Sequence, residues 1–188
     1  MKKTIFILLL LSFLIACKSE KVTHQEIVTN YYKARDAFNY NALKTVIDDS
    51  ITVIGGDYVM PYNQDSYYEE FKWDSIFRTS YKIVELIEED DWVMATVVSN
   101  SIKYEFLKNN PLTCQYRISF NSDKISKIES LECLGVNWDI WQEQKDTLVS
   151  WIDKNHPKLD GFIHDMTMNG ALNYLKAIAL YKEEKESL

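Results

Sequence analysis

Apolar side chains recur at helical spacing from Thr23 onward. They fall three and four positions apart as far as Phe38, which is the pattern of one buried stripe on an α-helix, and Arg35 lies on the same stripe. Thr23, with an acidic residue three positions later, fits the capping box that starts such a helix. Two further helices are predicted over residues 42–47 and 66–77, and the second of them is rich in aromatic side chains.

The middle of the chain carries short runs that are typical of β-strands. Residues 51–54 and 58–60 flank a Gly-Gly-Asp turn, and they are expected to form a hairpin that ends at Pro61. Four more strands are predicted at residues 81–87, 92–106, 112–120 and 124–133. The length of the second of these runs predicts a strong bend or a bulge.

The chain returns to helical spacing after Gly135. One helix is expected over residues 138–152, a break at His156 and Pro157, and a final helix over residues 169–185. Residues 136–188 are too few to fold alone, so we expect a helical extension packed on the unit formed by residues 23–135. The predicted fold class is α+β, with N-terminal helices covering one face of a curved antiparallel sheet.

The N-terminus has the composition of an export signal. Two lysines precede an apolar run over residues 5–16, which spans about 18 Å as a helix and is shorter than the ~30 Å hydrocarbon core of a bilayer. The run ends in Leu-Ile-Ala followed by Cys17, which resembles the lipobox of bacterial lipoproteins. The resemblance implies that residues 1–16 are a signal peptide and that Cys17 receives the lipid, a step for which a thiolate is the nucleophile. The alternative is an ordinary thiol beside an ordinary signal peptide.

This interpretation places the protein in the cell envelope. Residues 17–22 would form a short tether, and the lipid would hold the protein on the outer membrane, at its periplasmic or its surface face. The chain of 188 residues has a formal net charge of −7, which argues against nucleic-acid binding through phosphate neutralisation.

The order of elements resembles the nuclear transport factor 2-like (NTF2-like) superfamily, which includes the SnoaL-like polyketide cyclases and ketosteroid isomerase. The resemblance covers residues 23–135 and rests on that order, on Tyr31-Tyr32 in the first helix, on residues 50–53 opening the hairpin and on residues 122–125 opening the last strand. It implies a cone-shaped domain whose curved sheet and helices enclose an apolar pocket. Cystatin-like folds share this plan and remain an alternative.

The superfamily hosts isomerases, cyclases, transport adaptors and accessory subunits, so the fold leaves the function open. The first hypothesis is a lipoprotein that binds a small apolar ligand or a protein partner without catalysis. The second is a cofactor-independent enzyme that uses a pocket carboxylate, and the third is an accessory subunit of an envelope complex. The resemblance also makes a homodimer conceivable.

Enzymes of this fold use an acid–base pair in the pocket, because a desolvated carboxylate has a pKa nearer neutrality. Asp57 is the candidate base, although its place in a hairpin turn also explains it. Other groups that could take part are Tyr58, Tyr67, Tyr104 and Arg117. No cofactor motif is present, and the soft ligands in the stretch His164 to Met168 lack a second cluster, so no metal site is expected.

Aromatic residues gather around the predicted hairpin and third helix, where this fold has its pocket mouth. The candidate pocket residues are Tyr58, Tyr62, Tyr67, Tyr68 and Trp73. They would suit an apolar or sugar-like ligand, or they are core and dimer-surface residues.

Cys114 and Cys133 fall on the last two predicted strands. If the chain turns at residues 122–124, the two cysteines lie within one residue of direct opposition, and export would supply an oxidising setting. A shift of one residue would instead leave two thiols on opposite faces of the sheet.

Overall fold

The computed structural model describes residues 22–186. The predicted signal peptide and Cys17 lie outside the described residues. Three helices precede and flank the first strands: α2 (His24–Asp36), α3 (Tyr40–Val46) and α4 (Gln64–Ile76). Each begins at a polar cap, and the Thr23 side chain accepts from the Glu26 amide at the start of α2, within a complete capping box. The capping signal in the sequence therefore marks the observed start of the first described helix.

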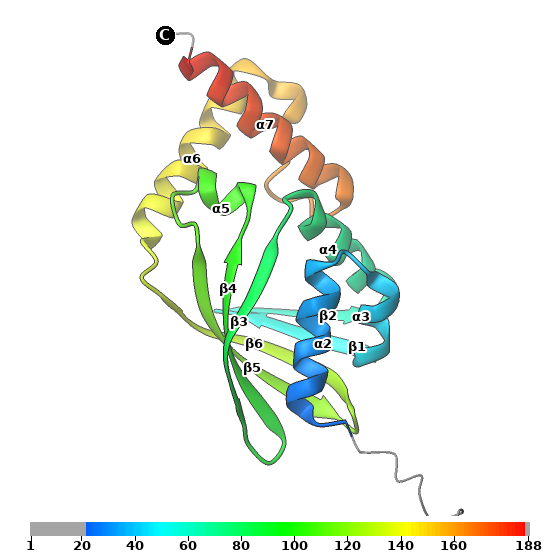
Figure 1. Ribbon diagram of the computed structural model, residues 1–188. Helices are drawn as coiled ribbons and strands as arrows, with labels where there is room; N and C mark the ends of the chain where they lie inside the picture. Colours follow the sequence, from blue (N-terminus) through cyan, green and yellow to red (C-terminus); the bar gives the residue numbers. More distant parts are fainter. Residues whose placement is uncertain (1–21, 187–188) are drawn as a thin grey trace, which may run out of the picture.

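Six strands form one curved sheet. They are β1 (Ile47–Gly55), β2 (Tyr58–Asn63), β3 (Ser80–Glu88), β4 (Trp92–Asn100), β5 (Leu112–Asn121) and β6 (Lys124–Leu134). Their order is β2-β1-β6-β5-β4-β3, and every neighbouring pair is antiparallel except β1 and β6, which run parallel. Helix α2 crosses one face of the sheet (Figure 1). The α+β fold with helices on a curved, mostly antiparallel sheet is as predicted.

The hairpin of β1 and β2 runs further than the sequence predicts. Pro61 does not end the second strand, because it pairs with Thr52 inside a strand that extends to Asn63. Strand β2 lies at the edge of the sheet, and an edge strand tolerates a residue without a backbone N–H.

The prediction of one long strand over residues 92–106 is wrong. Strand β4 ends at Asn100, and residues 102–106 form the short helix α5 (Ile102–Phe106). The Ser101 side chain accepts a hydrogen bond from the Tyr104 amide at 3.0 Å and caps this helix. The cap, with apolar residues on both sides, separates two elements that hydropathy alone joins.

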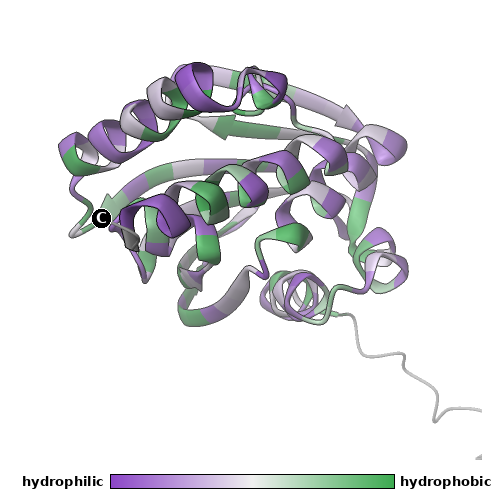
Figure 2. Ribbon diagram, turned by 90° about the horizontal axis from the view of Figure 1, so that it is seen from above, coloured by the Kyte–Doolittle hydropathy of each residue, from purple (hydrophilic) through white to green (hydrophobic). Residues whose placement is uncertain are grey.

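The C-terminal segment consists of α6 (Trp138–Asn155), a 3₁₀ turn (Pro157–Leu159) and α7 (Met168–Glu186). Both helices lie beyond α5 at one end of the molecule (Figure 1), and hydrophobic and hydrophilic residues alternate along them (Figure 2). Their apolar side chains form a second core with Phe77, Phe106 and Leu107, separate from the core between α2 and the sheet. No helix within residues 22–186 is long and apolar enough to cross a membrane.

Two irregularities in the pairing of β5 with β6 bring the cysteines face to face. Next to the turn, Asn121 faces Lys124, and beyond the first irregularity Ser119 faces Lys127. Beyond the second, Cys114 faces Cys133, and the structure joins them by a disulfide. The register therefore depends on these bulges.

Candidate functional site

A cavity of about 190 Å³ lies between helices α2 and α4, the sheet and helix α5. It is lined by Tyr31, Tyr32, Arg35, Val53, Tyr67, Glu70, Trp73, Asp74, Tyr81, Ser99, Lys103, Tyr104, Tyr116 and Ile128. The volume lies below the ~300–1,000 Å³ range of drug-sized ligand sites, so the cavity suits a molecule with few heavy atoms.

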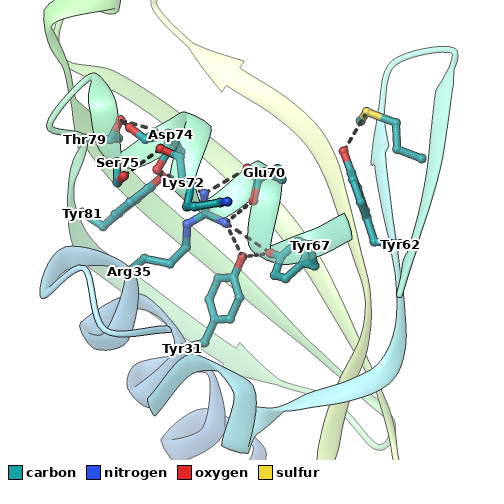
Figure 3. Close-up of polar contacts among 11 residues, drawn as sticks. Tyr31, Arg35, Tyr62, Tyr67, Glu70, Lys72, Asp74, Ser75, Thr79 and Tyr81 are labelled. Atoms are coloured by element: carbon teal, nitrogen blue, oxygen red, sulfur yellow. Dashed lines mark hydrogen bonds and ion pairs between the residues drawn. The ribbon is translucent and has the colours of Figure 1, made fainter. Parts of the chain in front are cut away.

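Arg35 is the central charged group of this cavity (Figure 3). Its Nη1 and Nη2 donate to the two carboxylate oxygens of Glu70, at 3.1 and 3.0 Å, which is a bidentate ion pair. Nη2 also lies 3.1 Å from a carboxylate oxygen of Asp74. The Arg35 side chain is 7 % exposed, so one buried cation is shared by two carboxylates.

Asp74 is held by three groups in addition to its place in α4. Its Oδ1 accepts from the Thr79 hydroxyl at 2.9 Å, and its Oδ2 accepts from the Tyr81 hydroxyl at 2.6 Å and faces Arg35. Burial pushes the pKa of Asp74 upward, but the Arg35 charge and the Tyr81 hydrogen bond outweigh it and lower the pKa below its usual range. Asp74 is therefore an ionised, weakly basic carboxylate.

Tyrosines of two helices complete the polar cluster. The hydroxyls of Tyr31 and Tyr67 are 2.5 Å apart, and Arg35 Nη1 donates to both. Burial raises the pKa of Tyr31 and of Tyr67, and it raises the pKa of Tyr116 to about 12. These phenols stay protonated at neutral pH.

Several hydrogen-bond donors of the cavity have no protein partner among residues 22–186. Arg35 Nε and Trp73 Nε1 are buried and unpaired. The hydroxyls of Tyr32, Tyr104 and Tyr116 likewise line the cavity without a hydrogen bond to a described residue. Arg35 Nε and Trp73 Nε1 are the buried members of this set, and buried donors are costly when unsatisfied, so a hydrogen-bond acceptor inside the cavity would stabilise it.

Lys103 brings an amine to the same space from α5. Its Nζ lies 4.3 Å from the centre of the Trp73 ring and 5.1 Å from that of Tyr104. Burial lowers the pKa of Lys103 to about 8, and the charges of Asp74 and Glu70 oppose this shift only in part.

The sequence-predicted pocket residues separate in the structure. Tyr67 and Trp73 line the cavity, whereas Tyr58 is 76 % exposed and Tyr68 41 % exposed. Tyr62 lies to the side, with its hydroxyl donating to Met60 Sδ (Figure 3). Tyr58 shares a face of β2 with Tyr62, but it lies at the end of the strand beside the exposed turn, so the cluster seen in the sequence is not one wall.

The structure does not bring Asp57 into the cavity. It lies exposed in the turn between β1 and β2, and it is not among the lining residues. Arg117 pairs with Glu129 at 3.4 Å and also lies outside, whereas Tyr104 is a lining residue. A turn position places Asp57 at the tip of a hairpin, away from the helices that roof the cavity.

The central residues of the site were missed from the sequence. Arg35 gave a visible signal, because it interrupts an otherwise apolar stripe of α2. The sequence gives no such signal for Glu70, Asp74 and Lys103, because their role depends on helices that come together only in the folded chain. Within residues 22–186 no group of three His, Cys, Asp or Glu side chains could hold a metal ion.

Comparison with solved structures identifies the architecture. An NTF2-like protein of unknown function from Cytophaga hutchinsonii is 13 % identical, covers 60 % of this chain and 92 % of its own, and has a TM-score of 0.50. The fold is NTF2-like. IdmH, a putative polyketide cyclase from Streptomyces antibioticus, is 11 % identical and covers 66 % of this chain and 99 % of its own, with a TM-score of 0.50.

A third match, a protein from Kribbella flavida, is 5 % identical, covers 65 % of this chain and 93 % of its own, and has a TM-score of 0.51. At such identities the likeness establishes the fold alone. No protein-family model and no curated protein matches the sequence. The activity therefore has to be argued from the cavity.

Proposed function

We propose that this protein binds a small cyclic molecule with an acceptor oxygen in its NTF2-like cavity, without catalysis, while a lipid on Cys17 holds it in the cell envelope. The observation that carries the binding role is the surplus of unpaired donors. Tyr104, Tyr116 and Trp73 line a space with aromatic walls, and their O–H and N–H groups have no hydrogen-bond partner among the described residues. The aromatic side chains can pack against the apolar part of a ligand, and the donors can hydrogen-bond to its carbonyl, ether or hydroxyl oxygen.

The state of the carboxylates favours binding over carboxylate-based catalysis. A pocket base has to be free to accept a proton, and its pKa should be near the working pH. Glu70 is engaged by both Nη groups of Arg35, and the lowered pKa of Asp74 makes it a poor base. Asp57, the other candidate, is solvent-exposed. A ketosteroid isomerase-like mechanism therefore has little support among the cavity residues.

The proposed location rests on two features. The first is the export signal that ends at Cys17. The second is the bond between Cys114 and Cys133, since disulfides persist in oxidising compartments such as the bacterial periplasm. Metabolic labelling with a radioactive or alkyne-bearing fatty acid tests the anchor. Incorporation should occur in the natural chain and should be lost in Cys17→Ala.

Native mass spectrometry of the full chain, purified in detergent from its own host, tests the binding role. We expect a co-purifying small molecule. The double variant Tyr104→Phe/Tyr116→Phe, which removes two donors and little volume, should lower its occupancy about tenfold or more, at ~1 kcal/mol for each hydrogen bond. Tyr58→Phe, on an exposed side chain, is the matched control. An empty cavity in the natural chain, or a stoichiometric second polypeptide in place of a small molecule, would overturn the proposal.

A further inference from the structure

Lys103 occupies an unusual place for a lysine. It lies on α5, a short helix that follows strand β4 directly, and it lines the cavity together with Trp73 and Tyr104. Its Nζ lies 4.3 Å from the Trp73 ring centre and 5.3 Å from that of Phe77. The amine is thus surrounded by aromatic surface on the side that faces α4.

No carboxylate is available to pair with this amine. Among residues 22–186, no Asp or Glu oxygen lies within 4.0 Å of Lys103 Nζ. The charged groups that face the cavity are Arg35, Glu70 and Asp74, and Arg35 already binds both carboxylates. The ammonium form of Lys103 therefore has cation–π contacts but no ion pair at contact distance.

The consequence is a nucleophilic amine at neutral pH. With a pKa of about 8, about a tenth of Lys103 is neutral at pH 7, against ~0.04 % for an ordinary lysine. Desolvation in an apolar pocket is one of the ways in which a lysine becomes able to attack carbonyl carbon. The neighbouring donors that stay protonated, Tyr104 and Tyr116, can hydrogen-bond the carbonyl oxygen under attack.

We infer that Lys103 is a covalent binding residue, which forms a reversible imine with an aldehyde or ketone group of a small cyclic molecule held in the cavity. The inference rests on the proposed binding role and names the ligand class. The neutral amine attacks the carbonyl carbon and forms a C–N bond. Both amine hydrogens then leave with the carbonyl oxygen as water, and a C=N bond remains. The reaction needs no oxidant, reductant or metal, and hydrolysis reverses it.

Reductive trapping with benzaldehyde tests this inference. The full chain in detergent is treated with benzaldehyde and sodium cyanoborohydride at pH 7, and the benzylated lysines are located by peptide mass spectrometry. We expect Lys103 to be labelled about tenfold or more faster than Lys108, an exposed lysine just beyond the same helix. Lys103→Arg keeps the positive charge and should lose this fast phase, whereas Lys108→Arg should retain it. Equal labelling of Lys103 and Lys108 would overturn the inference.

Benzamide separates this inference from the proposed function. It has the ring and the acceptor oxygen of benzaldehyde, but its amide carbonyl does not form an imine. Saturable benzamide binding that is weakened in Tyr104→Phe/Tyr116→Phe, together with no preference for Lys103 in trapping, would leave the binding role standing and overturn the imine. Absence of both benzamide binding and selective trapping would overturn both. Binding of benzamide together with selective trapping supports both.

Discussion

Arg35 and Glu70 form two parallel hydrogen bonds, at 3.1 and 3.0 Å, across the space between helices α2 and α4. The same guanidinium lies 3.1 Å from Asp74, one turn further along α4. This pairing ties the two helices that roof the cavity. It also engages both carboxylates that would otherwise be the candidate general bases of the site.

Removing the arginine should destabilise the fold strongly. Arg35→Met leaves two largely buried carboxylates without a cation, and breaking a buried pair in this way costs about 3–5 kcal/mol. Glu70→Gln should cost less, because Asp74 still pairs with Arg35. Urea unfolding followed by circular dichroism measures both. The account of the cluster is wrong if Arg35→Met unfolds at the same urea concentration as the natural chain.

Low pH should lower the free energy of unfolding through protonation of Asp74. Its folded-state pKa is lowered, so the unfolded chain binds the proton more tightly. The stabilising contribution is therefore complete above the unfolded pKa of about 3.9, and it is lost as the pH falls through the lower folded value. Unfolding free energies measured from pH 6 down to pH 2 should fall more steeply for the natural chain than for Asp74→Asn. Parallel curves for the two proteins would contradict this assignment.

The cysteine pair should contribute measurably to stability. The bond closes a loop between residues 19 apart in sequence, and the chain-entropy model gives about 3 kcal/mol for a loop of similar length. Cys114→Ala/Cys133→Ala should lower the unfolding free energy by about 2–4 kcal/mol. The natural chain treated with reductant is the control, and its unfolding free energy should approach that of the variant. If reductant changes nothing while the variant is weakened, the loss comes from packing at Cys114 instead.

The cap of α5 should control the cavity as well as stability. Ser101→Ala removes the acceptor of the Tyr104 amide and should cost about 1 kcal/mol. Because Lys103 and Tyr104 follow directly, fraying of this helix should also weaken benzamide binding. Ser126→Ala, at a partly buried serine on β6 that does not line the cavity, is a suitable comparison for both measurements. Unchanged benzamide affinity in Ser101→Ala would show that the cap has no influence on the site.

The sequence predicts most elements but only part of the site. Hydropathy and capping locate α2, α4 and the strands β3, β5 and β6 closely, because these signals are local. The boundary between β4 and α5 at Ser101 was not predicted, because apolar residues continue on both sides of it. Tyr67, Trp73 and Tyr104 were found as aromatic or polar candidates, whereas Glu70 and Asp74 looked like ordinary surface acids of a helix. The role of these two acids in the site depends on Arg35, which lies 35 residues before Glu70 in sequence and contacts it only after α2 and α4 pack together.

The second core has a practical consequence for anyone who wishes to shorten the chain. Phe77 and Leu107 are almost fully buried, and Phe106 is 5 % exposed, all beneath the side chains of α6 and α7. A fragment that stops at Gly135 would carry these three residues as exposed apolar surface. Such a fragment should be poorly soluble and prone to aggregation, although it contains every strand of the sheet. None of the residues that line the cavity belongs to α6 or α7, so the two C-terminal helices cover the second core and leave the walls of the cavity to the sheet, α2, α4 and α5.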